Sequence, residues 1–111
     1  MNGEIWEEAK SRAYGEIHDV IMRTAAYERN DKTTWDKVAA AVNNFVSSRY
    51  SQLLSSWIVV CDESVNTPDI VEANKFRLVF CWRVDSSEWT VVEFTLSPSI
   101  VVVSKCRPKT P

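Results

Sequence analysis

The spacing of the apolar residues changes once along this chain, near Leu54, from a helical period to a strand-like one. Before that point, two segments repeat apolar side chains at intervals of three and four residues, which predicts two amphipathic helices at about 4–28 and 33–54. After it, short runs are rich in β-branched and aromatic residues. The predicted strands are 56–61, 76–84, 89–96 and 99–103. This order predicts an α+β fold, with two helices packed on one face of a small, mainly antiparallel sheet.

The last apolar run consists of Ile100, Val101, Val102 and Val103, and it lacks the polar alternation of a half-exposed strand. Both of its faces therefore need cover. It is either a fourth strand within the same subunit or a strand given to the sheet of a neighbouring subunit. The sequence leaves both arrangements open, so the sheet could be completed by strands exchanged between subunits.

Length and composition limit the classes of protein that this chain can belong to. With 111 residues it forms one domain, expected at 1–104, followed by a loose basic tail at 105–111. The net charge of −2 without a basic block argues against nucleic-acid binding. The chain contains no apolar run of 18 residues, so no membrane span is predicted. Glu4, Glu7 and Glu8 stand in the region that would be positively charged in a secretion signal.

Two polar segments separate the predicted elements. The first, 30–34, has helix-capping chemistry: Thr33 followed by Asp36 approximates a capping box, which predicts Thr33 as the N-cap of the second helix. The second segment, 62–75, contains Pro68 and is predicted to be a long loop. Asp62, Asn66 and Thr67 are expected to cap this loop.

Nothing in the sequence predicts an enzyme, a cofactor or a metal. Asp62 and Glu63 are adjacent, whereas acid–base catalysis needs carboxylates that face each other across a substrate. The only histidine, His18, is expected at a helix surface. Cys61 and Cys81 are expected to be buried or half-buried thiols in a reducing compartment, and no ligand spacing indicates zinc. The five tryptophans are expected to pack in the core and at interfaces.

The two polar segments carry a resemblance to a known family. The run 27–31, Tyr-Glu-Arg-Asn-Asp, with Trp35 after it, resembles an aromatic-Glu-Pro-Asn-Asp element. The run 60–68, Val-Cys-Asp-Glu-Ser-Val-Asn-Thr-Pro, resembles a Val-x-Cys-Asp-Glu-x-x-Asn-Thr-Pro element. Both elements are typical of the C-terminal, tube-proximal domain of contractile phage tail sheath proteins. The matching residues are Glu28, Asn30, Asp31, Trp35, Cys61, Asp62, Glu63, Asn66, Thr67 and Pro68. Arg29 stands where the family has proline, and the resemblance covers about residues 10–104.

The resemblance implies a structural virion protein rather than an enzyme. It implies a minimal sheath-like subunit, assembled in the host cytoplasm into a ring, sixfold by analogy, that contacts the tail tube, the tail sheath or the baseplate. It also implies that Ile100, Val101, Val102 and Val103 lie at the subunit interface. Two alternatives are a baseplate sheath initiator with a similar core domain, and a free-standing phage protein that binds or inhibits a host protein.

Overall fold

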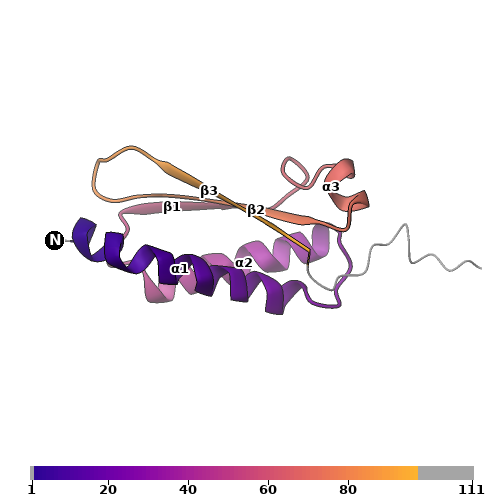
Figure 1. Cartoon of the computed structure of the whole chain (residues 1–111), viewed down its shortest axis with the longest axis horizontal. Coiled ribbons are helices and arrows are strands. Elements are labelled where there is room, and N and C mark those ends of the chain that lie inside the picture. The colour runs from indigo at the N-terminus through magenta and orange to yellow at the C-terminus, as the bar shows by residue number, and fades with distance from the viewer. Residues whose placement is uncertain (1, 98–111) are drawn as a thin grey trace, which may run out of the picture.

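Two helices pack against one face of a three-stranded antiparallel sheet, so the expected α+β fold class is confirmed (Figure 1). The computed structural model describes residues 2–97, and both the predicted strand at 100–103 and the tail at 105–111 lie outside them. In chain order the elements are α1 (Asn2–Ala25), α2 (Lys32–Arg49), β1 (Ser56–Val60), α3 (Pro68–Glu72), β2 (Phe76–Arg83) and β3 (Thr90–Leu96). None of the helices among residues 2–97 combines the length and the apolar character that a membrane crossing requires.

β2 is the central strand and pairs with a neighbour along each edge. Trp82 aligns with Trp57 of β1 on one side and with Thr90 of β3 on the other. Its side chains alternate between buried and half-buried along its whole length. This alternation is the period-two pattern of a sheet with one face on a core, and it was readable in the sequence of β2.

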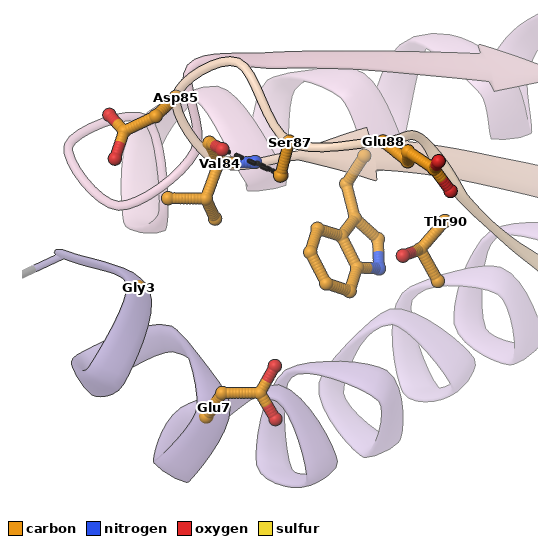
Figure 2. Close-up of a pocket in the computed structure, with 8 residues that line it drawn as sticks. Gly3, Glu7, Val84, Asp85, Ser87, Glu88 and Thr90 are labelled. Carbon is orange, nitrogen blue, oxygen red and sulfur yellow. Dashed lines mark hydrogen bonds between the residues drawn. The ribbon is translucent and has the colours of Figure 1, made fainter.

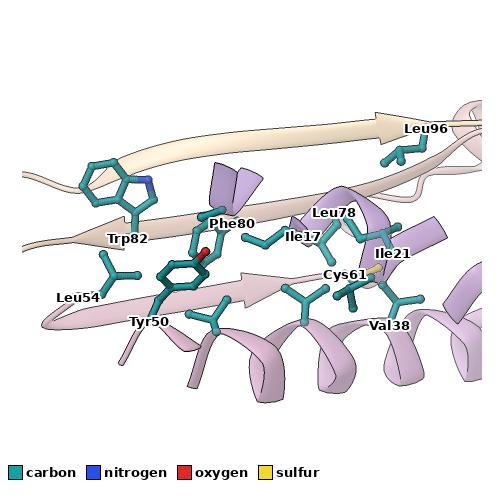
Figure 3. Close-up of a cluster of buried hydrophobic side chains, with 14 of the residues drawn as sticks. Ile17, Ile21, Val38, Tyr50, Leu54, Cys61, Leu78, Phe80, Trp82 and Leu96 are labelled. Carbon is teal, nitrogen blue, oxygen red and sulfur yellow. The ribbon is translucent and has the colours of Figure 1, made fainter. Parts of the chain in front are cut away.

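The core fills the space between the sheet and the two long helices (Figure 3). Phe80 and Leu78 point down from β2 toward Ile17 of α1 and Val38 of α2, and all four side chains have no exposed surface. At one end Trp6 is 1% exposed, and its ring lies edge-on to Tyr50 and Trp82 at centroid distances of 5.6 and 5.2 Å. Edge-on packing is favourable because the positive edge of one ring meets the negative face of the other.

The helix boundaries differ from those that the sequence predicts. α1 ends at Ala25 rather than near residue 28, because Tyr27 adopts a left-handed backbone conformation with φ 62° that stops the helix. The N-cap of α2 is Asp31, whose side chain accepts a hydrogen bond from the backbone N of Thr34 at 3.3 Å. The prediction of Thr33 as the cap is wrong, since Thr33 lies inside the helix. Aspartate caps a helix at least as well as threonine, so the earlier of the two residues takes the role.

The segment 62–75 is not an irregular loop throughout. It contains the short helix α3, with Pro68 as its first residue, where the missing N–H costs nothing. Five residues are too few to display a helical period, so Pro68 is the only sign of α3 that can be read from the sequence. α3 places Val71 against the core.

Candidate functional site

The two sequence motifs lie together at one end of the molecule, although more than 25 residues separate them along the chain. The turn between α1 and α2 carries the first motif, and the connection from β1 to α3 carries the second (Figure 1). Between them is a groove of about 470 Å³, hereafter the motif groove. Its lining residues are Asn30, Asp31, Lys32, Trp35, Glu63, Asn66, Pro68 and Val71.

Asn30 connects the first motif to the sheet. Its side chain is 4% exposed, and its Oδ1 accepts a hydrogen bond from Nε1 of Trp35 at 2.8 Å. Its Nδ2 donates to the carbonyl oxygen of Lys75, the residue before β2, at 2.9 Å. One buried amide therefore fixes the Trp35 ring in the wall of the groove and ties the turn between the helices to the start of the central strand. This is a structural role for both motif residues.

Asn66 connects the second motif to the sheet. It is 2% exposed, and its Oδ1 accepts from the backbone N of Arg77 while its Nδ2 donates to the carbonyl oxygen of Arg77, both at 2.8 Å. The amide thus pairs with the first part of β2 as a neighbouring strand residue would. A buried side-chain amide is tolerated because both of its polar atoms are bonded.

Cys61 and Asp62 have opposite electrostatic environments. Burial raises the pKa of the Cys61 thiol to about 12, so this cysteine is neutral at physiological pH and is not an activated nucleophile. The Asp62 carboxylate accepts hydrogen bonds from the hydroxyl and the backbone N of Ser64, and these bonds lower its pKa. Asp62 and Asn66 therefore cap the loop, as expected, whereas Thr67 stands at the N-cap of α3 without a side-chain hydrogen bond.

Six of the ten motif residues line the motif groove and four do not. Glu28 forms an exposed ion pair with Lys37 at 3.2 Å, which contributes little to stability. Cys61 is buried behind the groove, while Asp62 and Thr67 belong to its supporting loop. The predicted interface residues Ile100, Val101, Val102 and Val103 lie outside the described residues.

The chemistry of the motif groove suits binding of an apolar side chain. Its apolar lining residues, hereafter the apolar floor, are Trp35, Pro68 and Val71, and the charged residues Asp31, Lys32 and Glu63 also line it. Within residues 2–97 no three His, Cys, Asp or Glu side chains gather as metal ligands. His18 is exposed on α1, as expected, and is not among the residues that line the groove.

A second hollow of about 380 Å³ lies at the opposite end, between the start of α1 and the turn from β2 to β3 (Figure 2). Glu7, Asp85 and Glu88 border it, together with the ring of Trp82. The turn is held by Ser87, whose hydroxyl donates to the carbonyl oxygen of Val84 at 2.7 Å. These carboxylates come from a helix and a turn without forming a metal-binding group among the described residues.

Two residues of the motif groove were not among those predicted from the sequence. Val71 was hidden because it belongs to α3, although an Ile-Val pair inside a polar segment is a sign of burial. Lys32, the first residue of α2, carried no signal. Comparison with protein-family models, with curated proteins and with solved structures gives no match to this chain.

Proposed function

We propose that this chain is a structural virion protein of a contractile phage tail. It acts as a minimal sheath-like ring subunit that docks on the tail tube and templates sheath assembly by exchanging β-strands between subunits. The sequence motifs suggest the family, and the shape of the sheet suggests the mode of assembly. The single observation that carries the proposal is that both outer strands have an unpaired edge within residues 2–97.

The free edge of β1 lacks the devices that normally prevent pairing. The strand reads Ser-Trp-Ile-Val-Val, with no charge, proline or glycine. Soluble proteins usually place lysine, proline or a bulge on such an edge, because exposed N–H and C=O groups attract other strands. An unprotected edge is therefore a natural acceptor for a strand such as 100–103 from a neighbouring subunit.

Deletion of the C-terminal residues tests the strand exchange. A variant that lacks residues 99–111 should remain folded, because the described core lies entirely within residues 2–97. It should form no rings in negative-stain electron microscopy and support no sheath assembly. The matched control lacks only residues 105–111 and keeps Ile100–Val103, so it should assemble. Normal assembly by the shorter variant would contradict strand exchange.

The location of the protein tests the proposed function itself. Mass spectrometry of purified, sheathed virions should detect the chain at a copy number that is a multiple of six. Absence from virions that carry complete tails would refute a structural role in the tail. It would favour the second candidate, a free phage protein that binds a host protein, for which the apolar floor of the motif groove provides a binding surface.

Under that second candidate, Val71→Lys should abolish binding of the host protein, because it places a charge on the groove floor. Val71→Ile, which keeps the floor apolar, is the control. The same pair of variants should have no effect on ring formation through the C-terminal strand.

A further inference from the structure

The face of the sheet that points away from α1 and α2, hereafter the outer face, carries exposed apolar side chains. Both long helices lie on the opposite side of the sheet (Figure 1). On the outer face Ile58 is 48% exposed and Val91 is 64% exposed, and Trp89 just before β3 is 41% exposed. Exposed apolar side chains that gather on one face, instead of being scattered singly, are typical of an interaction surface.

The strand register arranges the outer face in rows. Ile58, Cys81 and Val91 align across the three strands and form an apolar middle row. On one side of the middle row, the next row contains Val79 and Glu93, which align with each other. The row on the other side holds Arg83, two residues from Cys81 on the same face of the strand. Beyond Glu93 the next row of the same face holds Arg77, which is ion-paired with Glu93. Along the strand direction the outer face therefore presents this ion pair, then the apolar row, then Arg83.

The charge of Arg83 has no carboxylate partner among residues 2–97. Its guanidinium lies over the ring of Trp89 at 5.0 Å, and its Nε is buried without a hydrogen-bond partner. Because Nε is buried, a carboxylate from outside the subunit would meet the Nη groups of this guanidinium. The Glu93 side chain is 52% exposed and forms an ion pair with Arg77 at 3.2 Å. The exposed side of its carboxylate is open to a further cation.

We propose that the outer face binds the outer face of a second copy of this chain, as a twofold dimer. If the twofold axis runs across the strands, the strands of the second copy run in the opposite direction. The middle rows of the two copies then face each other. It places Glu93 of one subunit opposite Arg83 and Trp89 of the other, twice. A twofold axis along the strands would instead place Arg83 against Arg83, so charge selects the first arrangement.

The dimer is weak and depends on concentration. Because only three strands contribute to the outer face, we expect an interface smaller than the roughly 800 Å² per partner of a standard stable complex. Twofold contacts are the commonest in soluble oligomers, and facing sheets pack about 10 Å apart. The proposal is independent of the proposed function, because it involves neither the strand edges nor residues 99–111.

Cross-linking through Cys81 tests the arrangement directly. In the variant Cys106→Ser, a short bismaleimide should link Cys81 to Cys81 across the axis, and Cys81→Ser should abolish the product. Cys61 is buried and does not compete. Spontaneous disulfide formation at Cys81 is not expected, because facing sheets hold the two Cα atoms beyond the roughly 7 Å limit for a disulfide. A dimer that forms in solution without this cross-link would overturn the proposal.

Exchange of the two charges gives a second, independent test by sedimentation equilibrium of the full chain. Arg83→Glu and Glu93→Arg should each weaken the dimer by about tenfold or more, since each creates a like-charge contact. The double variant should recover part of the affinity, because the pair between subunits is restored with opposite polarity, while the ion pair of Glu93 with Arg77 stays lost. Unchanged dimerisation in Arg83→Glu, or a chain that is monomeric at every concentration, would overturn the proposal. The C-terminal deletion tests ring formation separately. A failure of the dimer proposal can therefore be distinguished from a failure of the proposed function.

Discussion

The side-chain amide of Asn66 binds both backbone polar groups of Arg77, at 2.8 Å each. Arg77 is the second residue of the central strand, at the point where β1 has already ended. Asn66 therefore continues the pairing of β2 beyond β1 with a side chain in place of a strand. Its position in the Cys-Asp-Glu…Asn-Thr-Pro motif is explained by this bond rather than by chemistry on a ligand.

Asn66→Ala should destabilise the fold by about 2–4 kcal/mol. It leaves the backbone N–H of Arg77 without its partner and leaves the Arg77 carbonyl with only the weak thiol donor of Cys61. Urea unfolding followed by tryptophan fluorescence would measure the change in the free energy of unfolding. Asn44→Ala is the matched control, since Asn44 is exposed on α2 and alanine favours a helix. An equal loss in both variants would contradict the role assigned to Asn66.

The sheet was more predictable from sequence than the motif groove. The alternation of Phe76, Leu78, Phe80 and Trp82 carries strong information, because period two has one physical meaning in a half-buried strand. The same reasoning identified both long helices. Their ends were less predictable, because Tyr27 stops α1 in a backbone conformation that favours glycine and is unusual for tyrosine.

The proximity of the two motifs in the structure could not be predicted from the spacing of residues in the sequence alone. It depends on Asn30 reaching Lys75 and on Asn66 reaching Arg77, which are contacts between residues 45 and 11 positions apart. No period in the sequence encodes such contacts, since they follow from how the sheet sits on the helices. Resemblance placed Asn30 and Asn66 in two motifs of one family, and in the structure each amide ties its motif to the start of β2.

The bond between Asn30 and Trp35 should show strong energetic coupling. Trp35→Phe keeps an aromatic ring in the groove wall but removes the N–H donor, so it should cost about 1–2 kcal/mol. Asn30→Ala should cost more, because it also frees the carbonyl of Lys75. In a double-mutant cycle the two changes should be less than additive by about 1 kcal/mol. Simple additivity would show that the bond is not formed in solution.

Gly15 offers a stabilising substitution. It lies in the interior of α1, and a Cβ built there meets no atom within 4 Å. Gly15→Ala should therefore raise the free energy of unfolding by about 0.5–1 kcal/mol, because alanine loses less backbone entropy in a helix. Gly3→Ala, at the first turn of the same helix, is the comparison and should gain less, because helix ends fray. Thermal unfolding by circular dichroism would measure both.

The neutral state of Cys61 gives the fold a dependence on alkaline pH. Burial raises the folded-state pKa from an ordinary value of 9.0 to about 12. The unfolded chain releases this proton first, so the contribution is complete below pH 9.0 and is lost as the pH rises from there toward 12. The free energy of unfolding should fall over that interval, and Cys61→Ala should make the fall shallower. Cys81→Ala, which removes a thiol at a half-buried position of the same sheet, is the matched control.

The same burial should separate the two thiols in reactivity. At neutral pH, Cys81 should react with a thiol reagent much faster than Cys61, which is 5% exposed and whose raised pKa keeps it protonated. Labelling of Cys106→Ser followed by peptide mass spectrometry would measure the two rates, with urea-unfolded protein as the reference in which they converge. Equal rates in the folded protein would mean that β1 and its loop open readily, and that the amide of Asn66 does not hold them to β2.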